Sequence, residues 1–193
     1  MHTFKPIRQV APSQQVVTIS EMKAQARIDV DDENELLETY IAAAINHVDG
    51  YSGVLGRCLV SQTWKMGLTD WPKYKVQFPF PDVSSVELSY FDQDEVSTVV
   101  HESQFEIAEA SCGSLLLLKD NFEAPTVSQE SPVPISIQFV AGYGTAAQVP
   151  NPIKVAIMML AAHWYENRGA SGSADTLPFG VSSLLMPYRM VGL

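Results

Sequence analysis

His163 and Glu166 have the spacing in this chain that comes nearest to a metal-binding motif. They stand three residues apart in the segment HWYENR, so a helix would place both on one face. A histidine and a carboxylate at this spacing can supply half of the ligands of a carboxylate–histidine site. The sequence has no second pair of this kind. We therefore expect His163 to be a packed or capping residue, and we predict no metal.

A run of acidic residues at positions 29–35 has the density of a calcium loop but not its pattern. With Asp29 as the first ligand, Asn34 stands where an EF-hand loop needs glycine, and Tyr40 stands where it needs glutamate. Acidic side chains also stabilise the N-terminus of a helix through the helix dipole. The run therefore predicts the start of a helix.

Other patterns that indicate catalysis are missing from the sequence. It has no Gly-rich phosphate loop and no G-x-S-x-G motif. Cys58 and Cys112 form neither a C-x-x-C motif nor a disulfide framework, and neither has an obvious activating base beside it. We predict no enzymatic activity and no cofactor, and an enzyme ranks third among our hypotheses.

The composition indicates a globular and acidic protein. The 193 residues are 46% hydrophobic and have a mean hydropathy of +0.03, which is enough for a sizeable core. Twenty-two acids against 12 Lys and Arg give a net charge of -10. Because Lys and Arg supply most of the affinity for DNA phosphates, we expect no tight binding to nucleic acid. No secretory signal and no membrane-spanning segment are visible.

The strongest helix signal is the stretch PNPIKVAIMMLAAHWYENR at residues 150–168. We expect Asn151 to cap it, Pro152 to take its first position and Gly169 to end it. Apolar residues fill both sides of this helix: Ile153, Ile157, Leu160, Ala161 and Trp164 on one, and Val155, Met158, Met159, Ala162 and Tyr165 on the other. A helix that is apolar nearly all round is buried all round. We expect part of the second side to lie at a subunit contact or under the β-rich segment.

Helices are predicted on both sides of a β-rich segment. A capping-box spacing at Thr18 and Glu21 predicts a short helix to about Arg27. A longer helix is expected over residues 32–52, ended by the glycines that follow it. Residues 179–186 fit one more short helix.

Between residues 59 and 141 the apolar pattern changes from helical to alternating. Turn signals separate the candidate strands, which are residues 59–68, 75–80, 83–91, 96–100, 105–108, 114–118 and 133–141. Short strands at this spacing are typical of a small antiparallel sandwich or barrel.

The sequence therefore predicts an α+β fold: a helical bundle with an inserted antiparallel β-domain. The expected parts are an extended N-terminal arm at 1–17, a helical bundle at 18–58 and 142–187, the β-domain at 59–141 and a C-terminal docking tail at 188–193.

Three groups of residues are candidates for contacts with other proteins. The long helix offers the subunit-interface candidates Met158, Met159, Ala162, Tyr165, Glu166 and Arg168. The tail offers the docking residues Tyr188, Arg189, Met190, Val191 and Leu193, since Tyr and Arg are common interface hot spots. The arm offers Phe4, Lys5, Ile7 and Arg8. Two alternatives stay open: the tail folds back on its own bundle, and the arm is a loose terminus.

The order of several segments resembles the head–tail connector (adaptor) proteins of tailed bacteriophages, in the gp6-like or gp8-like family. The segments are VTISEMKAQARID, DDENELLETYIAAAINHVDGYSG, LVSQTW, FPFPDVSSV, FVAGYG, VPNPIKVAIMMLAAHWYENR and LPFGVSSLLMPYR. None is chemically specific by itself, but together they span nearly the full length. Residues 84–131 are the least similar to the family.

The resemblance implies a structural virion protein of the neck, made in the cytoplasm of a bacterial host. Its copies would form a ring, usually twelvefold, that sits beneath the portal protein and continues the DNA channel. The ring would receive a tail-completion or stopper protein and let double-stranded DNA pass without tight binding. The tail would dock on the portal, and the N-terminal arm is the competing candidate, either for the portal or for the next subunit of the ring. No membrane is involved.

The second-ranked hypothesis is a β-sandwich binding module of a phage tail or baseplate component. Trp64, Trp71, Tyr74 and Tyr90 are aromatic residues of the kind that line a sugar-binding face, although we favour a place for them in the sheet core and its loops.

Overall fold

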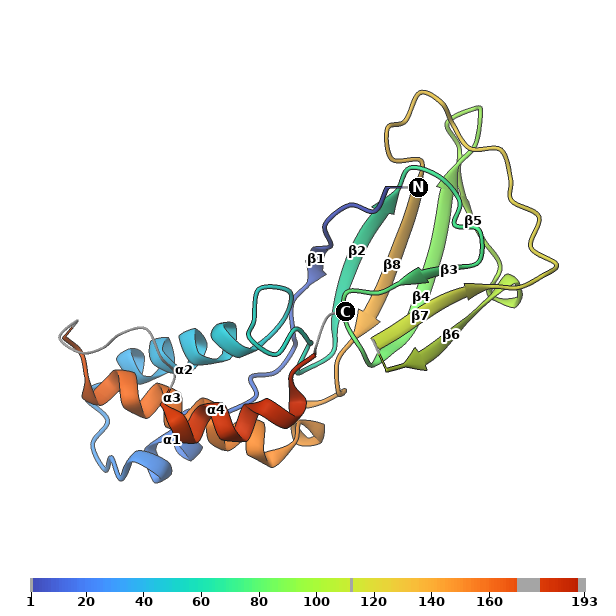
Figure 1. The fold of residues 1–193 in the computed structure, drawn as a ribbon. Coiled ribbons are helices and arrows are strands. Elements are labelled where there is room, and N and C mark those ends of the chain that lie inside the picture. Colours follow the sequence, from blue (N-terminus) through green and yellow to red (C-terminus); the bar gives the residue numbers. More distant parts are fainter. Residues whose placement is uncertain (1, 112, 170–177, 191–193) are drawn as a thin grey trace. The chain divides into compact units, whose positions relative to one another are not determined.

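The computed structural model describes residues 2–111, 113–169 and 178–190. Within these residues it holds α-helices and two antiparallel sheets, which confirms the predicted α+β class. Its internal contacts divide the chain into two compact units (Figure 1). Of the described residues, the strand unit comprises those up to Ser13 together with Ser61–Gly142, and the helical unit comprises Gln14–Val60 together with those from Tyr143 onward.

The helical unit contains α1 (Ile19–Ala26), α2 (Asn34–Val48), α3 (Asn151–Glu166) and α4 (Phe179–Leu185), with short 3-10 turns η2 (Ala146–Gln148) and η3 (Met186–Tyr188). The predicted capping box opens α1. Thr18 Oγ1 accepts from the backbone N–H of Glu21 at 3.2 Å, and Glu21 Oε2 accepts from that of Thr18 at 2.8 Å. This contact with the Thr18 backbone lowers the pKa of Glu21.

Both long helices end earlier than predicted. α2 ends at Val48 rather than Ser52, because Asp49 takes an extended conformation. Its carboxylate accepts a hydrogen bond from the backbone N–H of Leu59 at 2.7 Å. α3 ends at Glu166, because the side-chain amide of Asn167 donates to the carbonyl of His163 at 2.8 Å and caps the last turn ahead of Gly169.

The start of α3 also differs from the prediction. Pro150 takes the cap position, Asn151 is the first helical residue, and no side chain caps the helix. The first N–H groups of a helix have no partner within it, so a proline fits at several neighbouring positions. Pro150 and Pro152 therefore predicted the start of α3 to within a residue or two, but they did not predict which residue takes the cap position.

α3 is the central helix of its unit and packs against α1, α2 and α4. The core that joins these helices includes Met22, Leu37, Ile41, Ile153, Ile157, Leu160 and Val181, all of which are fully buried. Among the described residues, no helix is long and apolar enough to cross a membrane.

The strand unit contains a five-stranded and a three-stranded sheet. The larger has the order β1 (Ile7–Val10), β2 (Gln62–Leu68), β8 (Ile135–Ala141), β4 (Val83–Phe91) and β5 (Ser97–Val99). The smaller has the order β3 (Lys75–Gln77), β7 (Gly113–Leu118) and β6 (Phe105–Ala110), and the 3-10 turn η1 (Glu102–Gln104) precedes β6. Every neighbouring pair is antiparallel. The strands of the described chain close no barrel, so the barrel alternative is wrong.

Aromatic side chains fill the core of the strand unit. The rings of Trp64 and Phe80 lie 4.9 Å apart between centroids, and those of Phe78 and Phe139 lie 4.8 Å apart. β2 and β8 alternate between these buried positions and more exposed ones, as a strand buried on one face must.

The N-terminal arm is more ordered than predicted. Residues 7–10 form β1, which pairs with β2 so that Ile7 lies opposite Lys65 and Arg8 opposite Trp64. Pro6 is buried just before the strand. The nearby prolines indicated an irregular segment, but proline is tolerated at the start of a strand and at a sheet edge, which is where β1 lies.

Truncation of a core residue of α3 tests the central place of this helix. Ile157→Ala should lower the free energy of unfolding by about 2–5 kcal/mol, because it leaves a cavity in a fully buried site. Val30→Ala is the matched control, since Val30 is 58% exposed in the same unit. Urea unfolding measures both, and an equal, small loss of stability in the two variants would contradict the central packing of α3.

Candidate functional site

The apolar subunit-interface candidates of α3 are half-buried. Met158, Met159, Ala162 and Tyr165 all pack against the helical core while keeping part of their surface exposed. A Cβ atom added at Gly180 of α4 would lie 3.0 Å from Cε of Met159, so α4 passes close to this side of α3. The helical unit itself thus covers part of the face, and the remaining surface is available to a partner.

The end of α3 is tied to the start of α2 by a charged cluster of Glu33, Tyr165 and Arg168. Arg168 binds the Glu33 carboxylate through two nitrogens, at 2.8 Å and 2.6 Å, in the bidentate geometry that makes such pairs strong. The Tyr165 hydroxyl donates to the same carboxylate, and the Arg168 guanidinium lies 4.6 Å from the centre of the Tyr165 ring. Glu166 is exposed beside the cluster.

This cluster shifts the titration of its members. The hydrogen bonds from Arg168, and then that from Tyr165, lower the pKa of Glu33 to about 2. The hydrogen bond that each of them makes to Glu33 raises the pKa of Tyr165 and that of Arg168. The sequence placed Tyr165 and Arg168 at an interface, whereas both bind within their own unit. Their partner Glu33 belonged to the acidic run, and its spacing carried no signal of this contact.

The described part of the C-terminal tail folds back on the helical unit. Tyr188 packs against the helical core, and the backbone N–H of Met190 donates to the carbonyl of Leu55 at 2.8 Å. Arg189 remains exposed. The predicted docking residues Val191 and Leu193 lie outside the described residues.

Among the described residues of the helical unit, the large apolar side chains with the greatest exposure are Phe179 and Met186, at 88% and 75%. They stand seven residues apart, so the turn of α4 and η3 places them near one face, with the exposed Ser182 and Ser183 between them. The apolar spacing predicted a short helix here, and Phe179 and Met186 were not among the predicted contact residues. The seven-residue spacing of this apolar pair indicates a shared face of the helix, but the sequence carries no signal that this face is exposed.

In the N-terminal arm, Ile7 is 65% exposed and Phe4 is 41% exposed. Lys5 and Arg8 are also exposed, but Arg8 lies 6.0 Å from the centre of the Trp64 ring and donates to Gln62 Oε1 at 3.5 Å. Arg8 is thus partly held by its own unit.

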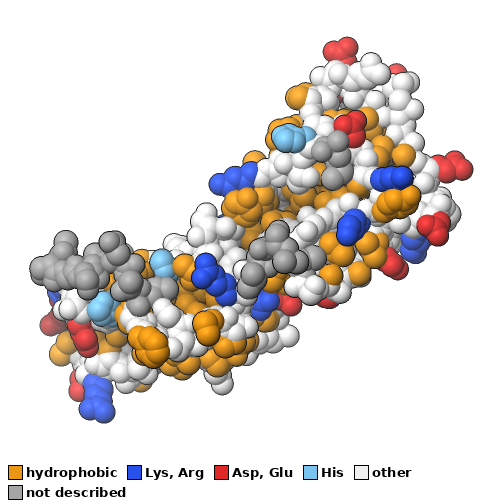
Figure 2. All heavy atoms as spheres, viewed as in Figure 1, with side chains coloured by type: hydrophobic (Ala, Val, Ile, Leu, Met, Phe, Trp, Pro, Cys, Tyr) orange, Lys and Arg blue, Asp and Glu red, His pale blue; other side chains and the backbone are white. Residues whose placement is uncertain are grey.

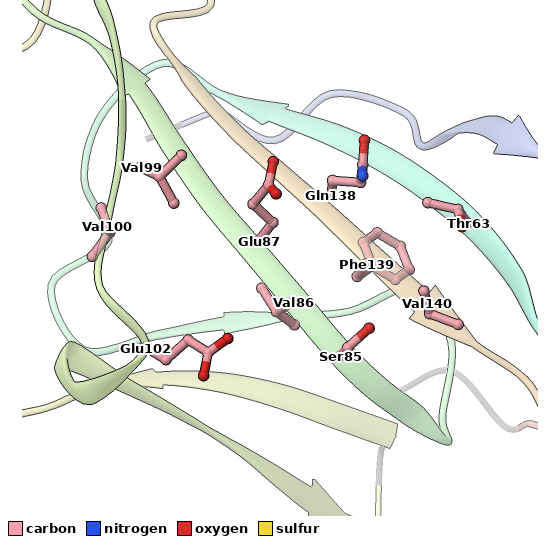
Figure 3. A pocket seen from close by; sticks show the side chains of 10 residues that line it. All are labelled: Thr63, Ser85, Val86, Glu87, Val99, Val100, Glu102, Gln138, Phe139 and Val140. Carbon is pink, nitrogen blue, oxygen red and sulfur yellow. The ribbon is translucent and has the colours of Figure 1, made fainter.

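The outward face of the five-stranded sheet carries a groove with a volume of about 340 Å³. It is lined by Thr63, Ser85, Val86, Glu87, Val99, Val100, Glu102, Gln138, Phe139 and Val140. In Figure 3 the side chains of Glu87 and Gln138 rise from neighbouring strands, with Val99 on one side and Thr63 on the other. Glu87 and Glu102 give the groove an acidic character.

The residues that suggested other chemistry have structural contacts. The side chain of Asn167 lies 3.3 Å from Nδ1 of His163 at the end of α3, and Asp31 binds Lys23 at 2.6 Å. Within the described parts of the chain, no group of three or more His, Cys, Asp or Glu side chains is arranged to hold a metal ion.

The aromatic residues of the proposed sugar-binding face do not form an exposed platform. Trp64 is buried, and the Trp71 ring packs 5.5 Å from Tyr90 and 5.1 Å from Phe122 between centroids. Tyr74 is exposed, at 64%. This packing weakens the carbohydrate-binding alternative.

Charged side chains of both signs are dispersed over the face of the molecule seen in Figure 2, with hydrophobic side chains between them. A mixed surface of this kind presents no large basic patch on that face, in keeping with the net charge of -10.

Comparison with known proteins identifies a family signature in the N-terminal part of the chain. The family model of the phage gp6-like head-tail connector protein matches residues 16–82, which confirms the resemblance seen in the sequence. No curated protein matches the chain.

Solved structures extend the likeness to the whole fold. A chain from the neck of an empty GTA particle, computed with C6 symmetry, is 23% identical with a TM-score of 0.79, covering 98% of this chain and 97% of that one. A chain from the virion of a native gene transfer agent (GTA) particle gives the same values. A chain from the neck of a native GTA particle, computed with C12 symmetry, has a TM-score of 0.68 and is also 23% identical, covering 96% of this chain and 97% of that one.

The Glu33 cluster predicts a pH dependence of stability. The folded pKa of Glu33, about 2, lies below its usual value of 4.5, so the carboxylate stabilises the fold at neutral pH and loses this effect as the pH falls from about 4.5 to 2. Glu33→Gln should therefore lower the Tm most at pH 7, and the difference from the native protein should shrink towards pH 2. Thermal unfolding followed by circular dichroism measures this. Glu38→Gln is the control on the same helix, and an equal pH profile in the two variants would contradict the role of the cluster.

Proposed function

Because residues 16–82 carry the signature of the phage gp6-like head–tail connector family, we propose that this chain is a structural virion protein that joins a head to a tail. Copies of the chain form a ring in the neck of the particle, between the portal protein and a tail-completion or stopper protein. The observation that carries this proposal is the family match, supported by a fold shared over nearly the whole chain with proteins of GTA necks. The family description names a connector and no reaction.

We propose that the two units are a helical bundle and a β-domain inserted into its sequence, an organisation that suits this role. The helical unit is built from two stretches of sequence, and the strand unit takes most of its residues from between them. We propose that the helical unit supplies ring contacts through the surface of α3 that stays exposed at Met158, Met159 and Ala162. Glu166, exposed at the end of α3, extends this surface.

A neck ring must let double-stranded DNA pass without holding it. The net charge of -10 supports this, since DNA affinity grows with the number of Lys and Arg side chains that neutralise phosphates. We propose a channel wall that is neutral or acidic and weakly adhesive.

The portal protein is the proposed partner of the C-terminal region. Phe179 and Met186 leave a large apolar area in water, and surfaces of this kind mark protein–protein contacts. The exposed Arg189 follows them in the chain and adds a residue type that is common at hot spots. The N-terminal arm, through Phe4 and Lys5, is the competing portal contact.

The function is tested by mixing the full-length chain with the portal protein of the same virus. We expect a stable complex on size-exclusion chromatography and a ring on the portal in negative-stain electron microscopy. A chain that neither binds the portal nor forms a ring on it would overturn the proposal.

The portal contact is tested by removing the exposed apolar pair. The double variant Phe179→Ser/Met186→Ser should weaken portal binding at least tenfold, because each side chain would bury apolar surface worth about 1.5 kcal/mol or more, and 1.4 kcal/mol is a factor of ten. The Tm should change little, since both residues are exposed. Val30→Ser is the control, and co-sedimentation with the portal gives the affinity. Normal portal binding by the double variant would assign the contact to another surface.

A further inference from the structure

The five-stranded sheet has two edges that no other strand of the described chain covers. β1 lies at one edge and β5 at the other. An edge strand presents backbone N–H and C=O groups that can pair with a strand of another molecule. Both edges belong to the strand unit, so the order and register of the strands determine how β1 and β5 are placed relative to each other.

The two edges match in direction and in the face that they present. All four pairings from β1 to β5 are antiparallel, so β1 and β5 run in the same direction. The register places Ile7 in one row with Lys65, Gln138 and Glu87, and it places Val99 opposite Ser89, two residues along β4. Because side chains alternate along a strand, Ile7 and Val99 lie on the same face of the sheet. They are 65% and 59% exposed.

The two edges also carry opposite charge. Residues 2–13, which contain β1, hold Lys5 and Arg8 and no acid. Residues 83–104, which contain β4, β5 and η1, hold no Lys or Arg and five acids, namely Glu87, Asp92, Asp94, Glu95 and Glu102. Potentials of opposite sign draw two surfaces together and suppress pairing between like edges. Each edge alone would repel a second copy of itself.

The groove lies directly beside the acidic edge. Val99 and Val100 form its border at β5, and Glu87 and Glu102 add carboxylates (Figure 3). A strand added along β5 would therefore place its outward side chains next to Val99, at the border of this groove. The outward apolar side chains of β1 include Ile7 and Val10, which is 57% exposed.

From this match we propose that β1 of one copy of the chain pairs with β5 of a second copy, so that Ile7 and Val10 pack beside Val99 at the groove. This inference rests on the proposed ring and names one of the surfaces through which its subunits meet. The contact joins two different surfaces, so it repeats from copy to copy and closes into a ring where the rotation between copies allows it. Parallel pairing of β1 with β5 results when the two copies have similar orientations.

Crosslinking between two populations of the full-length chain tests the contact. Ile7→Cys and Val99→Cys are made separately in a Cys112→Ser background, whereas Cys58 is buried and is retained. The populations are mixed, treated with a short bismaleimide and analysed by mass spectrometry, both free at high concentration and bound to the portal. We expect a covalent heterodimer in at least severalfold excess over either population alone. A yield no higher than that of Val30→Cys with Val99→Cys, in both conditions, would overturn the inference.

A charge exchange separates a true contact from chance collision. Lys5→Glu in the Ile7→Cys population, or Asp94→Lys in the Val99→Cys population, should lower the heterodimer yield severalfold, and combining them should restore it. The exchange of Lys73→Glu and Glu106→Lys is the control at exposed sites away from the two edges. A heterodimer yield that none of these four substitutions alters would argue against pairing between these edges.

Electron microscopy of the same samples distinguishes this inference from the function on which it rests. Rings on the portal without a 7–99 crosslink would overturn the strand pairing and leave the connector role intact. A 7–99 crosslink in a chain that forms no ring on the portal would support the pairing and overturn the ring.

Discussion

Burial of α3 is the constraint on which the helical unit depends. Its apolar side chains lie on nearly every side, so no single neighbour can remove them from water. The fold responds by packing α1, α2 and α4 around it. Those helices come from both ends of the sequence, and the strand unit occupies most of the chain between them. A helix that needs partners from distant segments therefore ties together the two parts of the chain that flank the β strands.

The polar contacts at the ends of the helices set their limits. Arg168 and Tyr165 bind Glu33 and join the end of α3 to the start of α2, while Asp49 ends α2 by turning its carboxylate to the backbone at Leu59. These contacts join residues that are distant in sequence or lie just outside a helix. They restrain where the helices end, which the apolar spacing alone leaves open by several residues.

Periodicity predicted the elements well and their ends and contacts less well. The alternating pattern located β2 to β8, with β4 at its predicted bounds, because a sheet buried on one face imposes a period of two on the sequence. The capping box at Thr18 was predicted because both of its partners lie within one turn. β1 was missed because it gains regular structure only by pairing with β2, more than fifty residues away. The exposure of Phe179 and Met186 likewise depends on which side of α4 faces α3, and no local pattern encodes this.

The strand unit raises the question of why an acidic protein keeps an N-terminal segment with two cations and no acid. A chain with a net charge of -10 repels copies of itself at long range, which favours solubility. Copies that repel each other assemble only where a local attraction exceeds this repulsion. Two surfaces of opposite charge, at different places on the chain, provide such an attraction. If the edge instead paired with the same edge of another copy, the copies would form closed dimers, because one partner then occupies the whole binding surface. The separation of charge between β1 and the β4–β5 hairpin thus favours growth from copy to copy over dimers, which is the form of association that a ring in a neck requires.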